Sequence, residues 1–260
     1  MSRITDAFRD KKTFIPFITC GDPDLDTTEK LVYAMAGAGA DIIELGIPFS
    51  DPTAEGPVIQ EANIRALSGK ERVTTDKVFD MVRRIRKKSD IPLVFMTYAN
   101  VVFSYGSETF ISVCKETGMD GLIVPDIPYE EKDEFAPFCR QYGIDFISLI
   151  APTSEDRIES IARDAQGFMY CVSSLGVTGT RSEITTDVGK MIRRVKDVKD
   201  IPCAVGFGIS DTETAKDMAA NSDGVIVGSA IIKIIARYKK QCVPYVEEFV
   251  RNMKEAVNAR

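Results

Sequence analysis

Short apolar runs rich in β-branched residues alternate with longer amphipathic stretches along almost the whole chain. Such alternation is typical of βα units built around a parallel sheet. The runs that predict strands are Thr13–Thr19, Ile42–Leu45, Pro92–Thr97, Gly121–Val124, Asp145–Leu149, Phe168–Val172, Pro202–Val205 and Val225–Val227. Eight alternations in a chain of 260 residues favour a closed barrel over an open doubly wound sheet. We therefore expect an α/β protein with a (β/α)8 fold, or TIM barrel, formed by a single domain over residues 1–260.

The predicted helices follow the strands in the order that such a barrel requires. They lie near residues 74–88, 107–117, 130–142, 155–164, 187–198, 212–220, 228–238 and 244–256, after a first helix capped by Asp26 or Thr27. Two connections, 47–74 and 173–187, are unusually long for βα loops. Long loops in a compact domain often form lids or binding sites, and in a barrel they lie on the catalytic face. We expect the functional site on that face.

The charge balance limits the partners that the chain can have. A net charge of −6 and a pI of about 5.0 argue against nucleic acid or an anionic membrane surface as the main partner. No apolar stretch approaches the ~20 residues of a membrane span, and the first residues contain no apolar signal region. We therefore expect a cytoplasmic protein that binds neither nucleic acid nor membrane.

The absence of histidine restricts the chemistry. His-based triads and His metal sites are excluded, so proton transfer must rest on carboxylates, Lys, Tyr or Cys. The six cysteines are scattered without a C-x-x-C pair, which predicts buried free thiols. No motif indicates a metal or an organic cofactor in this chain.

Glycine-centred segments follow the last three predicted strands. They are Gly176-Val177-Thr178-Gly179, Gly206-Phe207-Gly208-Ile209-Ser210 and Gly228-Ser229. Glycine lets the backbone approach an anion closely, and the eighth helix offers free amides at its positive end. Barrels commonly bind phosphate after strands 7 and 8, so these segments predict a phosphate site in the loops after strands 6–8. The alternative is that the glycines only close βα turns.

Two acidic residues are candidates for acid–base chemistry. Glu44 interrupts the apolar second strand, where a carboxylate is costly unless it is protonated or paired. At the carboxyl end of a barrel strand it predicts a catalytic acid with a raised pKa, and the alternative is a buried salt-bridge partner. Glu55 lies eleven residues later in a loop, where acids are usually solvated. Asp51 is ambiguous as well, because an aspartate before a proline is common in turns.

The segment Glu44-Leu45-Gly46-Ile47-Pro48-Phe49-Ser50-Asp51-Pro52, followed by Ala54-x-Gly56-Pro57-x-Ile59-Gln60, resembles the signature of tryptophan synthase alpha chains. The same family resemblance extends to Pro16-Phe17-Ile18-Thr19-x-Gly21-Asp22-Pro23, Tyr98-Ala99-Asn100, Asp126-Ile127-Pro128 and the glycine segments after strands 6 and 7. These motifs run in family order from about residue 14 to residue 235.

The resemblance implies a (β/α)8-barrel lyase that splits indole-3-glycerol phosphate into indole and glyceraldehyde 3-phosphate in tryptophan biosynthesis. Glu44 matches the catalytic glutamate, and Glu55 stands where the family usually has aspartate. The other matches are Phe17, Tyr170 and Phe207 around the indole pocket, Thr178 in the lid loop, Gly179, Gly208, Gly228 and Ser229 in the phosphate cradle, and Asp51, Pro52, Asn100 and Pro128 at the beta chain.

The family pattern also implies a partner. The alpha chain passes indole to a beta chain in an α2β2 heterotetramer, and pyridoxal phosphate belongs to the beta chain alone. Two alternatives share most of the motifs: a stand-alone indole-3-glycerol-phosphate lyase, and a catalytically weak allosteric activator of the beta chain. Other phosphate-binding barrels, such as phosphosugar isomerases, lack the block from Glu44 to Pro57.

Overall fold

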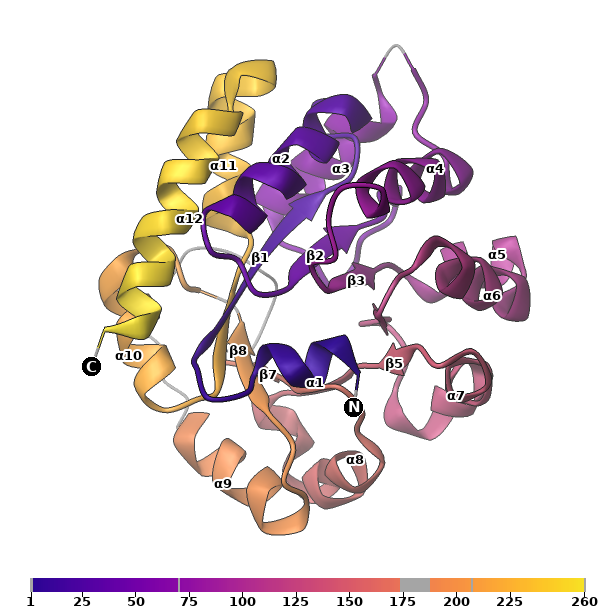
Figure 1. Ribbon diagram of the computed structural model, residues 1–260. Helices are drawn as coiled ribbons and strands as arrows, with labels where there is room; N and C mark the ends of the chain where they lie inside the picture. Colours follow the sequence, from indigo (N-terminus) through magenta and orange to yellow (C-terminus); the bar gives the residue numbers. More distant parts are fainter. Residues whose placement is uncertain (1, 70, 174–187, 207, 260) are drawn as a thin grey trace.

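The computed structural model describes residues 2–69, 71–173, 188–206 and 208–259. A ring of parallel strands is surrounded by helices (Figure 1). The strands are β1 (Thr13–Thr19), β2 (Ile43–Gly46), β3 (Leu93–Met96), β4 (Gly121–Ile123), β5 (Asp145–Phe146), β6 (Ser148–Ile150), β7 (Met169–Val172), β8 (Cys203–Gly206) and β9 (Gly224–Val227). Their order in the sheet is β5-β4-β3-β2-β1-β9-β8-β7-β6.

The fifth predicted strand is split into two pieces. β5 pairs with β4, and β6 pairs with β7, with Ile147 between them. The amide of Ile147 still donates to the carbonyl of Leu122 at 2.9 Å, so the chain follows β4 before it turns to β7. The two ends of the sheet therefore meet at one strand, and the predicted (β/α)8 barrel is confirmed.

The helices alternate with the strands around the ring. They are α1 (Arg3–Ala7), α2 (Leu25–Gly37), α3 (Pro57–Leu67), α4 (Thr75–Arg86), α5 (Ala99–Tyr105), α6 (Ser107–Thr117), α7 (Ala136–Tyr142), α8 (Ile158–Asp164), α9 (Val188–Val198), α10 (Thr212–Ala220), α11 (Ser229–Tyr238) and α12 (Val243–Asn258). Short 3₁₀ helices η1 (Tyr129–Glu134), η2 (Pro152–Arg157) and η3 (Lys239–Gln241) precede α7, α8 and α12. Among these described helices, none is long and apolar enough to cross a membrane.

Several local predictions were wrong. Asp24 caps α2, because its side chain accepts from the amide of Thr27 at 2.7 Å, whereas Asp26 and Thr27 lie inside the helix. The expected loop 47–74 contains α3, which starts at Pro57 after the N-cap Gly56. The helices expected at 130–142 and 155–164 begin as 3₁₀ turns. Of the other long loop, only residue 173 lies within the described ranges.

The two faces of each strand have different surroundings. In β3, Phe95 points outward, because its ring packs against Phe79 and Phe110 of the helix layer with centroids 5.7 and 6.3 Å apart. In β1, Phe17 faces the barrel interior in register with Glu44 of β2. Side chains of a strand alternate between the two faces. The even-numbered residues of β2 therefore point into the barrel.

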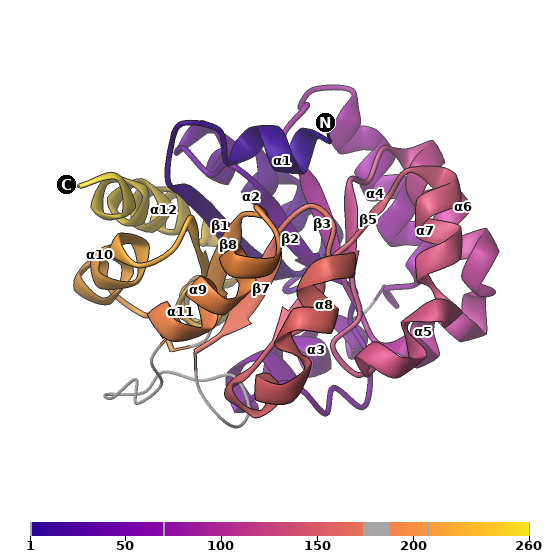
Figure 2. The same ribbon diagram turned by 90° about the horizontal axis from the view of Figure 1, so that it is seen from below.

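Helix α1 closes one end of the barrel (Figure 2). Ile4 is fully buried, and a Cβ on Gly121 would lie only 2.9 Å from its Cδ1 atom. The ring of Phe8 packs on Phe168 with centroids 5.6 Å apart. Because apolar side chains of α1 fill the amino-terminal end, a ligand must enter at the carboxyl ends of the strands.

All six cysteines are buried and none is in a disulfide. This confirms the prediction of buried free thiols. Burial raises the pKa of the Cys20 thiol well above its usual range. A thiol of this kind is a poor nucleophile, because the thiolate is the reactive form.

Candidate active site

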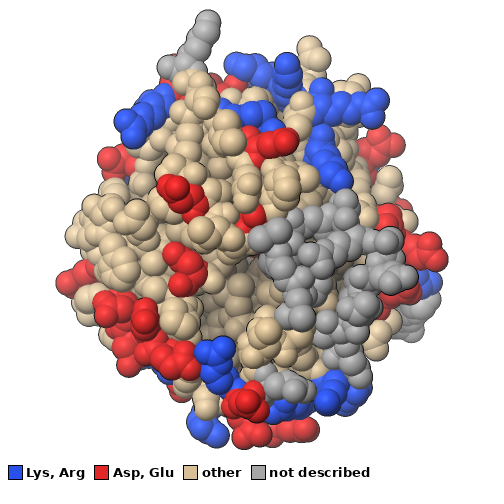
Figure 3. Space-filling view, turned by 180° about the vertical axis from the view of Figure 1, so that it is seen from behind, with Lys and Arg blue, Asp and Glu red and all other residues tan. Residues whose placement is uncertain are grey.

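The face of the molecule opposite α1 is hollowed at its centre (Figure 3). It is the face on which the barrel strands end, and ligand sites of such barrels are built there from the βα loops. Glu44 belongs to β2, and Tyr170 belongs to β7. Glu55 lies in the loop after β2. These residues come from three separate segments of the chain.

Glu44 is almost completely buried, with 1% of its side chain exposed. Neither carboxyl oxygen has a hydrogen-bond partner, and no ion pair is formed by this residue in the described part of the chain. The salt-bridge alternative is therefore wrong for the described residues. Burial raises the pKa of Glu44 to about 8, with a further contribution from the nearby charge of Glu55. The carboxyl group is mainly protonated at neutral pH and can act as an acid.

Glu55 is buried as well, with 3% exposed, so it is not an ordinary solvated loop acid. It sits just before Gly56, the N-cap of α3, where the positive end of the helix dipole favours a carboxylate. The backbone of Glu55 is held on both sides. Its amide donates to the carbonyl of Pro52 at 3.0 Å, and its carbonyl accepts from Nε2 of Gln60 at 2.8 Å.

Two tyrosines adjoin the carboxyl pair. Burial raises the pKa of Tyr170 well above its usual range, and Glu44 and Glu55 raise it further. Burial also raises the pKa of Tyr98, followed by the charge of Glu55. The hydroxyl of Tyr98 accepts from the amide of Ala54 at 3.1 Å, so it fixes the loop beside Glu55. Both phenols stay protonated, and the electrostatic contacts show that the two acids and Tyr170 share one interior.

Tyr98 adjoins the carboxyl pair, and the sequence patterns did not single it out. It occurs in the segment Tyr98-Ala99-Asn100, which carried the family resemblance, but only Asn100 received a role there. The signal that could have identified Tyr98 is its position at the carboxyl end of a strand, where side chains of a barrel reach the site.

Glycines leave room for flat aromatic rings at this end of the barrel. A Cβ on Gly46 would lie 2.7 Å from the ring of Phe17, and one on Gly228 would lie 3.2 Å from the same ring. A Cβ on Gly206 would lie 2.5 Å from the hydroxyl of Tyr170. Phe17 and Tyr170 therefore form aromatic walls next to Glu44, and such walls suit a planar apolar ligand.

The expected phosphate cradle is described in part. Gly228 directly precedes α11 and has no side chain to cap it, so the first amides of that helix are available to an anion. Ser229 is the first residue of α11. Gly208 has a φ of +78°, and a Cβ placed there would meet no described atom within 4 Å, so the backbone is open to a ligand. Thr178, Gly179 and Phe207 lie outside the described residues.

The residues expected at a beta chain lie around the rim of the same face. Asp51, Asn100 and Pro128 are exposed, whereas Pro52 is buried within the chain. Asp51 accepts a hydrogen bond from the hydroxyl of Ser50 at 2.5 Å. A cavity of about 610 Å³ lies between the loop after β2 and α5, and its lining includes Ser50 and Asn100.

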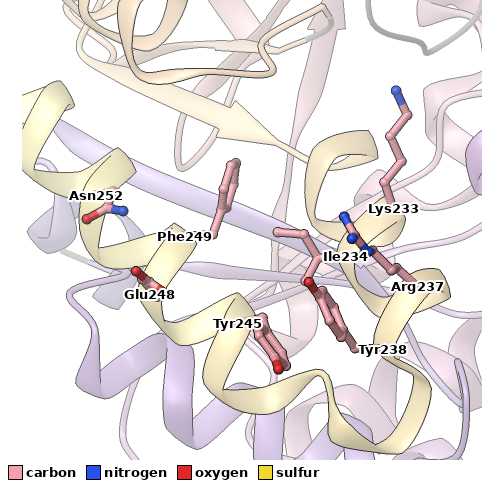
Figure 4. Close-up of a pocket in the computed structure, with 8 residues that line it drawn as sticks. All are labelled: Lys233, Ile234, Arg237, Tyr238, Tyr245, Glu248, Phe249 and Asn252. Atoms are coloured by element: carbon pink, nitrogen blue, oxygen red, sulfur yellow. The ribbon is translucent and has the colours of Figure 1, made fainter.

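A second concave surface lies on the outside of the barrel, between α11 and α12 (Figure 4). Its volume is about 380 Å³. Tyr238 and Tyr245 stack with ring centroids 3.7 Å apart, and the guanidinium of Arg237 lies 5.2 Å from the centre of the Tyr238 ring. The stacked tyrosines join the two helices, and the groove belongs to the outer wall and not to the strand ends.

A barrel with a buried, protonated glutamic acid beside a second buried carboxyl and two aromatic walls defines an acid–base enzyme for an aromatic substrate. No group of three or more metal-ligating residues occurs in the described ranges. The comparisons with known proteins identify the family. The family model for the tryptophan synthase alpha chain matches residues 5–258. The chain belongs to this family.

Curated relatives and solved structures agree over nearly the whole chain. The tryptophan synthase alpha chain of Lacticaseibacillus casei is 48% identical over 260 residues, which cover 100% of this chain and 97% of that protein. That of Caldanaerobacter subterraneus is 48% identical over 264 residues, covering 99% and 100%. A structure of Mycobacterium tuberculosis tryptophan synthase superposes with a TM-score of 0.90 at 31% identity, covering 100% and 99% of the two chains.

Family membership excludes the other phosphate-binding barrels that the fold alone allowed. The chain is a carbon–carbon lyase, and its reaction is the cleavage of indole-3-glycerol phosphate that the sequence resemblance implied.

Proposed function

We propose that Glu44 carries out both proton transfers in the cleavage of indole-3-glycerol phosphate to indole and glyceraldehyde 3-phosphate. The state of its carboxyl group supports this role most strongly. The group is buried, its pKa is raised to about 8, and it has no hydrogen-bond partner among the described residues. A general acid works best when its pKa lies near the operating pH. An acid without a protein partner is also free to bond with the substrate.

The reaction needs one acid step and one base step. Glu44 donates its proton to C3 of the indole ring, which makes an indoleninium ion. The C3–C3′ bond then breaks, and its electron pair forms the C2=C3 double bond. The π electrons of the C2=N bond move to the nitrogen, so the ring becomes aromatic again. The 3′-hydroxyl loses its proton to the Glu44 carboxylate as the aldehyde forms. The carboxyl group ends protonated, so the cycle is complete without another base.

Glu55 has a different role in this proposal. As a carboxylate at the amino end of α3, it accepts a hydrogen bond from the indole N–H and stabilises the positive charge that develops on the ring. The side chain of Glu55 is one methylene longer than the usual aspartate, so the position of its loop decides where the carboxylate lies. The contacts of Ala54 with Tyr98 and of Glu55 with Gln60 fix that position. Stabilisation of this kind acts on the transition state more than on the bound substrate.

The remaining predicted residues complete the site. We propose from the family pattern that Phe17, Tyr170 and Phe207 contact the indole ring and that Thr178 acts in the lid loop; Thr178 and Phe207 lie outside the described residues. The phosphate binds to backbone amides around Gly179, Gly208, Gly228 and Ser229. The uncapped start of α11 and the open backbone at Gly208 support this arrangement.

A beta chain is the proposed partner, in an α2β2 complex that accepts the indole. A structure described as the basis of mutual activation of the tryptophan synthase α2β2 complex from Pyrococcus furiosus is similar to this chain, with a TM-score of 0.85 and 35% identity over 94% of this chain. Asp51, Asn100 and Pro128 are exposed for such a contact, and Pro52 supports the loop from within. The pyridoxal phosphate belongs to the beta chain, and this chain needs no cofactor of its own.

Indole release from indole-3-glycerol phosphate tests the proposal, with and without a tryptophan synthase beta chain. Wild type should release indole, faster when the beta chain is added, and Glu44→Gln should lose nearly all turnover. The variant should still bind indole-3-propanol phosphate, which lacks both hydroxyl groups. Retained turnover would remove Glu44 from the mechanism. Rapid release that the beta chain does not change would indicate a stand-alone lyase, and no release with beta still bound would indicate an activator.

A further inference from the structure

The hydroxyl of Thr19 is buried without a hydrogen-bond partner in the described part of the chain. Thr19 ends β1, is 1% exposed, and its Oγ1 atom bonds to none of the described residues. A buried hydroxyl that bonds to nothing destabilises a fold, because its bonds to water are lost and not replaced. Such groups are uncommon in folded proteins and call for an explanation.

The strand register directs this side chain into the barrel. Thr19 pairs with Gly46, and Phe17 pairs with Glu44, so the inner face of β1 carries Thr19 one layer nearer the mouth than the catalytic acid. Gly46 has no side chain, and the ring of Phe17 lies over its position, 2.7 Å from where a Cβ would stand, so Thr19 and the aromatic wall of the site share this part of the interior. The orphaned hydroxyl therefore belongs to the same interior as Glu44.

The sheet order places β1 between the two ends of the proposed substrate site. β2, with Glu44, flanks it on one side, and β9, which leads into Gly228 and α11, flanks it on the other. A substrate whose reacting carbon lies at Glu44 and whose phosphate lies at α11 must cross the end of β1. The part that crosses is the three-carbon chain, whose middle carbon carries the 2′-hydroxyl.

We propose that the hydroxyl of Thr19 binds the glycerol chain of the substrate at its 2′-hydroxyl. This inference rests on the proposed function, because it assumes that indole-3-glycerol phosphate spans the site from Glu44 to α11. Thr19 then selects ligands that carry a hydroxyl at this carbon. A site with a polar group that only the correct ligand satisfies rejects the analogue that lacks the hydroxyl.

Thr97 provides a matched control. Its Oγ1 is also buried without a partner among the described residues, and its side chain is also 1% exposed. Its amide continues the ladder of β3 to the carbonyl of Ile123 at 3.1 Å, so alternation places Thr97 on the outer face with Phe95. The two threonines differ in the side of the sheet that they face, and not in burial or in hydrogen bonding.

The test compares Thr19→Val, Thr19→Ser and Thr97→Val with wild type, using two ligands that differ only in their hydroxyl groups. Turnover of indole-3-glycerol phosphate reports on the hydroxylated ligand, and calorimetric binding of indole-3-propanol phosphate reports on the other. Thr19→Val should lower kcat/KM about tenfold, the effect of one lost hydrogen bond, and leave the affinity for the propanol phosphate unchanged. Thr19→Ser should retain most of the activity, and Thr97→Val should match wild type with both ligands.

Thermal unfolding without ligand separates binding from folding. Thr19→Val should unfold at the same temperature as wild type or higher, because valine keeps the shape and removes the orphaned group. Equal losses with both ligands, or a lower unfolding temperature, would assign the hydroxyl to the fold and overturn the inference. Unchanged kcat/KM in Thr19→Val, with an active wild type, would overturn it and leave the role of Glu44 intact. A wild type that releases no indole would refute both.

Discussion

Glutamine in place of Glu44 keeps the size of the side chain and removes its ability to ionise. In the folded chain, burial, with a contribution from Glu55, raises the pKa of Glu44 to about 8 from an ordinary value of 4.5. Between these two values the unfolded chain has lost the proton and the folded chain retains it. The stability that this group contributes is fully present below pH 4.5 and is lost progressively as the pH rises to about 8.

The magnitude follows from the size of this shift. Each pKa unit corresponds to about 1.4 kcal/mol, so holding Glu44 protonated at pH 7 costs the folded chain on the order of 3 kcal/mol. Glutamine is neutral in both states and has no such cost. Glu44→Gln should therefore be about 3 kcal/mol more stable than wild type at pH 7, and the difference should nearly vanish at pH 4.5.

Urea unfolding of both proteins, followed by circular dichroism at half-unit steps from pH 4.5 to 8.5, measures this difference. The difference in unfolding free energy should grow by about 1.4 kcal/mol per pH unit and level off above pH 8. Glu248→Gln is a suitable control, because that glutamate is exposed and its substitution should change stability by less than about 0.5 kcal/mol. A difference that is the same at pH 5 and pH 8 would refute the reasoning.

Two further substitutions test other contacts at the carboxyl ends of the strands. Gly206→Ala puts a Cβ 2.5 Å from the hydroxyl of Tyr170, so it should displace that ring, lower indole release and destabilise the chain by about 1–3 kcal/mol. Gly37→Ala is the control, because its Cβ would meet no described atom within 4 Å, and it should change neither indole release nor stability. Equal effects of the two substitutions on turnover and on urea unfolding would contradict the steric argument. Arg65→Leu removes both bonds to the carboxylate of buried Asp22, at 2.9 and 2.7 Å, and should cost about 3 kcal/mol at pH 7 in urea unfolding. A loss below about 0.5 kcal/mol would show that Asp22 finds other partners.

The sequence predicted the parts of this structure that local patterns determine. The strands were found because apolar runs of this length are distinctive, and Glu44 was found because it breaks such a run. The helix Pro57–Leu67 was missed, since its proline and preceding glycine look like loop residues until they are placed at N1 and N-cap.

Features that depend on several segments could not be predicted in the same way. The burial of Glu55 follows from the packing of its loop against Tyr98, which follows β3, and no local pattern records that contact. The hydroxyl of Thr19 has no hydrogen-bond partner within the described ranges, and this too is evident only once all neighbouring strands are in place. The sequence therefore indicates which residue types stand at a strand end, and the assembled barrel determines which of them are unsatisfied.

Two unsatisfied groups and one well-satisfied carboxylate lie at opposite ends of the barrel. At the carboxyl ends of the strands, Glu44 and Thr19 are buried without partners among the described residues, and both weaken the fold. At the amino ends, Asp120 accepts from Arg3 at 2.6 Å, from Arg86 at 2.9 Å and from the amide of Leu93 at 2.9 Å. These bonds tie α1, α4 and β3 together around one buried carboxylate. Stabilising contacts at the closed end thus let the open end retain polar groups that a substrate, and not the protein, can satisfy.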